Sequence, residues 1–276
     1  MLQNLSSLLQ PAREKGYAVA CFNVFGYEDA LAVVTAAEQR QASVILSINL
    51  DMREFMPLEH IAAMLIPLAE STSAPVCLHL DHTYDINSVK QAVDCGFTSV
   101  MYDCSQLPIM ENIEGIQKVV EYGKGNDVSV EAEVGSVPYA SGRDHIKSTL
   151  TQIDEALQMQ RQAKPDAIAI SIGNVHRIEN AFVDIDFDHF QALKDSIDTP
   201  MVIHGTSGIK PEDVRALTSK GIAKFNIGTC VRQRFGMALR QALDSDPKLF
   251  DRLTIMKQVI PEVSDEAAKM IKLLGQ

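Results

Sequence analysis

Three histidines in this chain each follow an apolar, strand-like segment: His82, His176 and His204. Asp81 stands directly before His82, where the run Ala74-Pro-Val-Cys-Leu gives way to polar residues. A carboxylate beside an imidazole can hold a metal ion and move a proton, the two tasks that carbonyl chemistry needs. Three imidazoles that converge at one place form a catalytic zinc site with an open fourth position. We therefore expect Zn²⁺ on these three histidines.

The alternative for each histidine is a structural role, since a single histidine at the end of a strand is more often hydrogen-bonded than bound to a metal. Three histidines at the same end of the sheet favour a metal site, provided that the strands form a barrel. His79 is expected in the core or behind a ligand. His60 and His189 fall on expected helices and should be solvated, and His145 falls in a loop.

Two acids also end strand-like runs near these histidines, Asp103 and Glu133. They could orient the ligands or offer a second metal position. A plain hydrogen-bonding role is equally open for each. Glu131 has the same parity as Glu133, so it either points the same way from deeper in the fold or forms an internal ion pair.

Short apolar runs alternate with segments of helical periodicity along the whole chain. Eight expected strands cover 17–24, 43–49, 75–81, 98–103, 128–134, 167–173, 201–205 and 223–227, and helix-like segments lie before the first strand and after each one. This order predicts a single (β/α)₈ TIM barrel domain over 1–276. An open doubly wound sheet is the competitor, but no G-x-G-x-x-G follows the first strand.

Two regions depart from the repeat. Residues 135–150 form a long polar loop after the fifth strand, which we expect to act as a mobile lid. Residues 245–276 form a C-terminal helical extension, expected as two helix-like pieces split by Pro261. This extension suits an oligomer interface, and we expect a homodimer or homotetramer.

Composition excludes several classes of function. The net charge of −11 argues against a nucleic-acid partner, which needs a basic face. No apolar run approaches the roughly 20 residues that span a bilayer, and no basic-then-apolar leader opens the chain, so we expect no membrane partner and no export. The five cysteines form no C-x-x-C pair and are expected as reduced thiols in the cytoplasm.

Two turns combine glycines with hydroxyl residues, His204-Gly-Thr-Ser-Gly208 and Asn226-Ile-Gly-Thr229. They follow the seventh and eighth expected strands, the habitual phosphate position in TIM barrels, where backbone N–H groups can approach an anion. The pair of turns therefore predicts a small phosphorylated substrate.

At these residues the sequence resembles the class II, zinc-dependent fructose-bisphosphate and tagatose-bisphosphate aldolases. The matching motifs run in family order over about 2–230: Gly16-Tyr-Ala-Val-Ala-Cys-Phe-Asn23, His79-Leu-Asp-His82, Gly96-Phe-Thr-Ser-Val-Met-Tyr-Asp103, Glu111-Asn112, Ser129-Val-Glu-Ala-Glu-Val-Gly135, Ile172-Gly-Asn-Val-His176, His204-Gly-Thr-Ser-Gly208 and Asn226-Ile-Gly-Thr229.

The resemblance implies reversible aldol cleavage of a phosphorylated ketose to an aldehyde and a product like dihydroxyacetone phosphate, through a zinc-stabilised enediolate. It implies zinc on His82, His176 and His204, an alternative metal position at Asp103 and Glu133, and Asp81 as the acid/base. The substrate-binding residues expected from the turns and the resemblance together are Asn23, Arg177, Gly205, Thr206, Ser207, Asn226, Ile227, Gly228 and Thr229.

Several positions depart from the family pattern. The loop after the fifth strand should carry a Glu that transfers a proton, and Ser141 stands near that place, with Asp144 or His145 as substitutes. Arg177 replaces the Gly after the second ligand, and either contacts the substrate or narrows the pocket. Two alternatives follow: a zinc- and phosphate-binding paralogue without aldol activity, or a metal-dependent sugar-phosphate epimerase or isomerase.

Overall fold

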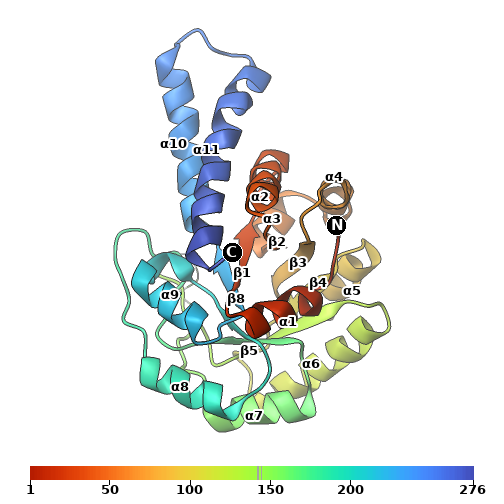
Figure 1. The fold of residues 1–276 in the computed structure, drawn as a ribbon. Helices are drawn as coiled ribbons and strands as arrows, with labels where there is room; N and C mark the ends of the chain where they lie inside the picture. Colours follow the sequence, from red (N-terminus) through yellow and green to blue (C-terminus); the bar gives the residue numbers. More distant parts are fainter. Residues whose placement is uncertain (142, 144) are drawn as a thin grey trace.

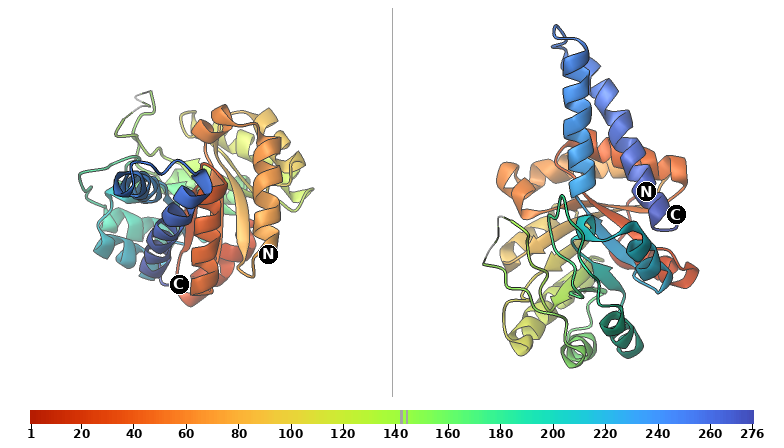
Figure 2. Two further views of the ribbon diagram at one scale, coloured as in Figure 1. Left: turned by 90° about the horizontal axis from the view of Figure 1, so that it is seen from above. Right: turned by 90° about the vertical axis from the view of Figure 1, so that its left-hand side faces the viewer.

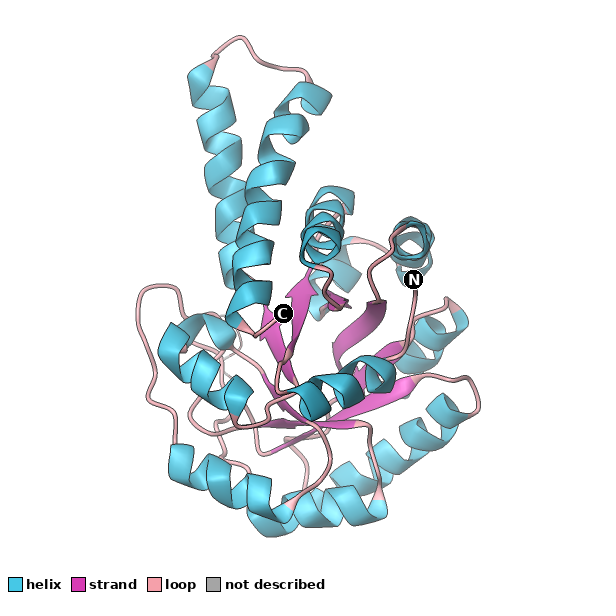
Figure 3. Ribbon diagram, in the orientation of Figure 1, coloured by secondary structure: helices cyan, strands magenta, loops and turns pink. Residues whose placement is uncertain are grey.

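Eight parallel strands pair in chain order and close into a barrel, β1 against β8, in a computed structural model that describes residues 1–141, 143 and 145–276. The ring of strands with helices outside it is a TIM barrel, which confirms the predicted fold class (Figures 1 and 3). The strands are β1 Val19–Asn23, β2 Val44–Ile48, β3 Val76–Thr83, β4 Ser99–Tyr102, β5 Ser129–Val134, β6 Ala167–Ile170, β7 Met201–Ile203 and β8 Lys224–Ile227.

Helices follow the strands as the periodicity predicts. They are α1 Leu5–Lys15, α2 Tyr27–Arg40, α3 Leu50–Phe55, α4 Leu58–Ser71, α5 Ile86–Asp94, α6 Ile109–Lys124, α7 Ile153–Gln162, α8 Phe187–Ser196, α9 Pro211–Ser219, α10 Thr229–Ser245 and α11 Arg252–Leu273, with a 3₁₀ turn, η1, at Thr206–Gly208. The short α3 was not predicted, because six residues are too few to display helical periodicity. Asn49 caps it by accepting a hydrogen bond from the N–H of Met52.

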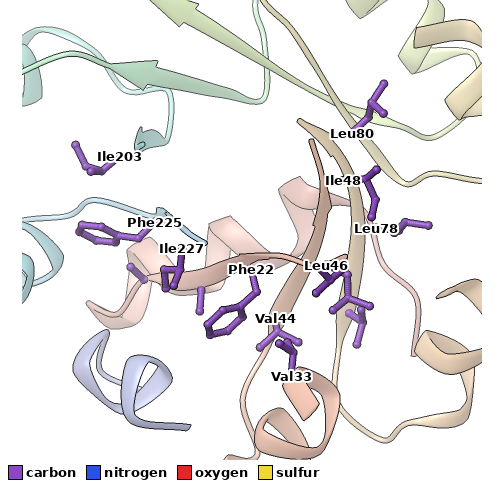
Figure 4. Close-up of a cluster of buried hydrophobic side chains, with 14 of the residues drawn as sticks. Phe22, Val33, Val44, Leu46, Ile48, Leu78, Leu80, Ile203, Phe225 and Ile227 are labelled. Carbon is purple, nitrogen blue, oxygen red and sulfur yellow. The ribbon is translucent and has the colours of Figure 1, made fainter. Parts of the chain in front are cut away.

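Apolar side chains fill the space on both sides of the strands. The outer core lies between barrel and helices and includes Phe22, Leu46, Leu78, Phe225 and Ile227, all labelled in Figure 4. A smaller inner core occupies the barrel interior. Strands buried on both faces read as continuous apolar runs, which is why periodicity located them but did not separate their two faces.

Helix α1 lies across one end of the barrel (Figure 1). Its apolar residues Leu5, Leu8, Leu9 and Ala12 are spaced to form one face and pack with the inner core. The Asn4 side chain caps its start, and Gly16 ends it in the left-handed conformation at φ 75°. The opposite end of the barrel, where the strands finish, stays open for a site.

Helices α10 and α11 form a hairpin that projects from the barrel (Figures 1 and 2). The prediction of two pieces split by Pro261 was wrong, because α11 is one continuous helix that contains this proline. Its buried stripe of Ile255, Val259, Val263, Ala267 and Ile271 runs past the proline, and burial of that stripe outweighs the roughly 3 kcal/mol that an interior proline costs. None of the described helices is long and apolar enough to cross a membrane.

A buried ion pair lies inside the barrel. Lys224 Nζ donates to Glu131 Oε2 at 2.6 Å, and both side chains are 0% exposed. Glu131 Oε1 also accepts from His204 Nε2 at 2.9 Å. Burial alone would lower the pKa of Lys224, but the neighbouring Cys21, Glu131 and Asp81 outweigh it and raise that pKa. Of the two roles left open for Glu131, the structure therefore shows the internal ion pair.

The change Lys224→Met should destabilise the fold strongly, because it leaves the Glu131 carboxylate buried without its cation. Loss of one partner of a buried pair costs roughly 3–5 kcal/mol in the free energy of unfolding. Urea denaturation followed by circular dichroism measures the loss. The double variant Glu131→Gln/Lys224→Met should recover most of it, because no charge then remains unpaired and the introduced amide oxygen can still accept from His204.

Lys220→Met is the matched control for that prediction. Lys220 is exposed at the end of α9, so its loss should change the free energy of unfolding by less than about 0.5 kcal/mol. A Lys224→Met protein as stable as this control would contradict the prediction.

Candidate metal centre and active site

The end of β3 presents two successive side chains, Asp81 and His82, to the same cavity. Successive residues of a regular strand point to opposite faces, so a regular β3 could expose only one of them there. The pairing of β3 with β4 shifts register between Leu80 and Thr83, and His82 has a left-handed backbone at φ 43°. Such an irregularity re-aims a side chain, which explains how both groups reach one site.

The three histidines named by the sequence meet at this mouth. His82, His176 and His204 each offer a ring nitrogen within 4.8 Å of the others. Their ring centroids are 4.8 to 5.5 Å apart, with the rings close to perpendicular. These side chains come from the ends of β3, β6 and β7, so only closure of the barrel brings them together.

Hydrogen bonds to acids fix which nitrogen each imidazole offers. His204 Nε2 donates to Glu131 Oε1, and His82 Nδ1 donates to Asp103 Oδ2, both at 2.9 Å. This leaves His82 Nε2 and His204 Nδ1 pointing at each other, 2.9 Å apart. An acid behind a histidine ligand is the usual device for holding its tautomer and orientation.

Charge decides the protonation of this pair. Burial would lower the pKa of His82, but Asp81, Asp103 and Glu133 outweigh it and raise that pKa to about 9. Burial and the positive charge of His82 lower the pKa values of His176 and His204 well below the usual range. These charges favour His82 as the protonated imidazole, and its Nε2 faces His204 Nδ1 in the place where a metal would compete for the same lone pairs.

His176 supplies the third nitrogen. Its ring stacks on Tyr139 with centroids 4.3 Å apart, and its buried Nε2 has no hydrogen-bond partner in the described part of the chain. A buried nitrogen without a partner costs free energy, which a bound cation would recover. His176 Nε2, His82 Nε2 and His204 Nδ1 together form a set of nitrogen ligands that fits a divalent metal ion.

A second group of possible ligands lies beside the first and consists of His82, Asp103 and Glu133. Burial would raise the pKa of Asp103, but the bond from His82 outweighs it and lowers that pKa to about 2. Burial and the Asp103 charge raise the pKa of Glu133 to about 8, and its buried Oε2 has no hydrogen-bond partner among the described residues and lies 3.9 Å from His82 Nδ1. The backbone N–H of Val137 donates to its other oxygen at 3.0 Å.

Two amides hold the Asp81 carboxylate. Asn23 Nδ2 donates to Oδ2 at 3.1 Å, and Asn226 Nδ2 donates to Oδ1 at 3.2 Å. Burial would raise the pKa of Asp81, but His82, His204 and Lys224 outweigh it and lower that pKa. Both amides were predicted to bind substrate. They also line the cavity, so their first visible role is to orient Asp81.

The two predicted anion turns border the same cavity, which has a volume of about 60 Å³. Gly205 has φ 70°, and a Cβ there would lie 2.4 Å from the carbonyl oxygen of Val175, so only glycine fits. Of the predicted substrate-binding residues, Ile227 does not line the cavity, because its side chain is 2% exposed and belongs to the outer core. The lining residues include Asn23, Arg177, Gly205, Thr206, Ser207, Asn226, Gly228 and Thr229.

Backbone hydrogen bonds close the base of the loop 135–150 and attach the loop to the segment after β6. Ser136 and Thr149 exchange backbone hydrogen bonds across its base, and Ala140 and Pro138 pair with His176. This pairing sets Tyr139 against His176. Of the proposed substitutes for the expected Glu, Asp144 lies outside the described residues, and His145 is exposed and does not line the cavity.

The other histidines take structural positions. His79 is 0% exposed and bonds through Nδ1 to Ser99 Oγ at 2.8 Å, as the core interpretation predicted. The prediction that His189 is solvated was wrong: it is half-buried, and its Nε2 bonds to the Thr151 carbonyl at 2.7 Å. Helical periodicity could not predict this contact, because it does not indicate which backbone carbonyl of another segment lies beside the helix.

Four residues at the mouth were missed by sequence reasoning: Asp51, Tyr139, Arg143 and Arg232. Tyr139, Arg143 and Arg232 line the cavity, and Asp51 contacts Arg143 and Arg177 at its rim. Lone polar residues in loops and short helices carry no motif.

Comparisons with known proteins agree with this arrangement. The sequence model of the family described as fructose-bisphosphate aldolase class-II matches residues 3–276. A fructose-bisphosphate aldolase of Mycoplasma genitalium is 34% identical over 286 residues, covering 100% of this chain and 98% of the relative. A 6-phospho-5-dehydro-2-deoxy-D-gluconate aldolase of Halalkalibacterium halodurans is 34% identical over 253 residues, covering 91% and 88%. The crystal structure of the YdjI aldolase from Escherichia coli K12 superposes with a TM-score of 0.88 at 29% identity, covering 100% and 98%.

The affinity of the protein for a divalent metal should rise about 10-fold per pH unit between pH 7 and 9. His82 has a pKa of about 9 in the metal-free protein, so each binding event in this range displaces one proton. Competition with a chelator, using Zn²⁺ as the probe, measures the slope. The control His60→Ala removes an exposed histidine and should leave it unchanged. A pH-independent affinity would contradict the protonation assigned to His82.

Proposed function

The chain belongs to the class II fructose-bisphosphate aldolase family and is an aldehyde-lyase, and we propose that it cleaves a phosphorylated ketose at a zinc site formed by His82, His176 and His204. One observation carries this proposal. His82 and His176 line one cavity with a single described carboxylate, Asp81, and with two glycine- and hydroxyl-containing turns, and the buried His204 places a ring nitrogen within 4.8 Å of theirs. Metal ligation, proton transfer and anion binding are thereby assigned to different residues of one site.

Three imidazoles favour zinc because its common catalytic sites use three protein ligands and leave one position open. A bound zinc ion would supply Lewis acidity at the substrate carbonyl. The protein's contribution is orientation: Glu131 and Asp103 hold the rings of His204 and His82, and Tyr139 packs flat on His176. Asp103 and Glu133, with His82, offer the alternative metal position.

Asp81 is the proposed acid/base. Cleavage requires a proton to leave the hydroxyl next to the breaking C–C bond, and synthesis returns it. Asp81 adjoins His82 in the chain and faces the cavity, held by Asn23 and Asn226. Two amide donors keep its carboxylate in one orientation, which a proton transfer over hydrogen-bond distance needs.

The substrate phosphate is assigned to the turns after β7 and β8. Gly205, Ser207, Gly228 and Thr229 border the cavity, and glycine allows the backbone N–H groups to approach an anion. The aldolases of Mycoplasma genitalium and Halalkalibacterium halodurans act, by their names, on phosphorylated compounds, which supports a phosphorylated ketose. The same proposal includes one barrel domain with residues 245–276 as its extension, a cytoplasmic location, and a homodimer or homotetramer.

Two substitutions should separate metal binding from proton transfer. His176→Ala should remove bound zinc and cleavage together, because it deletes one of three ligands. Asp81→Asn should keep zinc but reduce kcat by about 10²–10⁴-fold, the usual contribution of an acid/base group. Zinc content is measured by elemental analysis, and cleavage is assayed with fructose- and tagatose-bisphosphate.

The matched control is His60→Ala, which should retain both zinc and activity because His60 is exposed on α4. Full cleavage by a zinc-free His176→Ala protein would contradict the assigned metal site. Unchanged kcat in Asp81→Asn would contradict the assigned acid/base.

A further inference from the structure

Three charged residues from separate loops meet over the mouth of the barrel. Asp51 lies in α3 after β2, Arg143 in the loop after β5, and Arg177 after β6. Arg143 Nη2 donates to Asp51 Oδ1 at 3.1 Å, and Arg177 Nη2 donates to Asp51 Oδ2 at 2.6 Å. One carboxylate thus bridges two guanidinium groups, with one oxygen for each.

This cluster adjoins the proposed metal site through Tyr139. The guanidinium carbons of Arg143 and Arg177 lie 5.1 and 5.4 Å from the centroid of the Tyr139 ring, within cation–π range. The same ring stacks on His176 at 4.3 Å. A group held by the two arginines is therefore one aromatic ring away from the proposed ligand His176.

The two guanidinium groups of the cluster carry more positive charge and more N–H donors than Asp51 uses. Two guanidinium groups face one carboxylate, which leaves one positive charge on a chain whose net charge is −11. Each guanidinium has five N–H donors, yet only one nitrogen of each bonds to another described residue. Asp51 is itself 41% exposed, so its carboxylate can be displaced without opening the core.

The cavity beside the cluster continues into a second hollow at the mouth. A groove of about 680 Å³ adjoins it and shares Arg177, Thr229 and Arg232 with it. The far end of a substrate bound in the cavity therefore has room to extend through the mouth, past Arg177.

The phosphate turns follow β7 and β8, whereas Asp51 and Arg143 follow β2 and β5 on other parts of the barrel rim. With the ketone phosphate on those turns, the aldehyde-derived half of the substrate is left to face the cluster. We propose that Arg143 and Arg177 select an aldehyde half that carries a carboxylate, and that Asp51 occupies the place of this carboxylate when no substrate is bound. This assignment rests on the proposed function.

A carboxylate fits better than a phosphate because the cluster already holds one. The planar fork of a guanidinium matches the two oxygens of a carboxylate, and Asp51 shows that two arginines can share them. Asp51 then acts as a specificity filter, since only a group able to replace its two bonds gains access to the arginines.

Three aldehydes that differ only at carbon 3 test the proposal: glyceraldehyde, glyceraldehyde 3-phosphate and tartronate semialdehyde, which carries a carboxylate there. Each is combined with dihydroxyacetone phosphate and the zinc-loaded protein, and kcat/KM for the aldehyde is measured. We expect tartronate semialdehyde to exceed both others by about 10-fold or more, the usual value of a charged hydrogen bond. Equal values, or a preference for the phosphate, would overturn the proposal.

Variants of the cluster should change this preference in opposite directions. Arg143→Gln and Arg177→Gln should lower kcat/KM for tartronate semialdehyde roughly 10- to 100-fold more than they lower it for glyceraldehyde, mainly through KM. Asp51→Asn should lower KM for tartronate semialdehyde, because the competing carboxylate is gone. A rise in KM with Asp51→Asn, like that of the arginine variants, would mean that the cluster only braces the loop, and would overturn the proposal.

The matched control is Arg161→Gln, an exposed arginine in the last turn of α7 that lines neither cavity, and it should change none of these values. Exchange of the dihydroxyacetone phosphate C–H proton with solvent distinguishes a failure of the cluster's assignment from a failure of the proposed function. Exchange without a carboxylate preference would overturn the cluster's assignment alone. Absence of both exchange and cleavage in the unsubstituted protein would overturn the proposed function and this inference with it.

Discussion

A single buried carboxylate connects the stability of this barrel to its site. Glu131 on β5 neutralises Lys224 on β8 and accepts a hydrogen bond from His204, the residue after β7, and all three side chains are buried. The ion pair makes a charged glutamate tolerable in the interior, and the charged glutamate fixes the tautomer of His204. The nitrogen that His204 offers to the mouth therefore depends on a lysine that never reaches the cavity.

A local irregularity in β3 orients the side chains on the other side of the site. A regular strand would send Asp81 and His82 to opposite faces, whereas the register shift and the positive φ of His82 bring both to the cavity. Asp103 then orients the imidazole, and Asn23 and Asn226 orient the carboxylate. In the proposed function, these neighbouring residues take separate roles, His82 as a metal ligand and Asp81 as the acid/base.

An acidic protein that binds an anionic substrate needs local hydrogen-bond donors. The net charge of −11 opposes such a substrate at long range, so capture must depend on local donors near the mouth. Glycine-containing turns after β7 and β8 lie on one part of the rim, and Arg143 and Arg177 lie on another. Asp51 pairs with both arginines and neutralises one of their two charges.

The sequence alone determined the barrel, its eight strands, the three histidines, Asp81 and the two anion turns, because short-range periodicity and residue type at strand ends carry that information. It left open the partner of Glu131 and gave the wrong form of α11, because an ion pair between β5 and β8 and a stripe packed across Pro261 are long-range contacts. It also missed Asp51, Tyr139 and Arg143, which come from separate loops. Their association depends on closure of the barrel, which brings residues far apart in the chain to one rim and so decides the chemistry of the mouth.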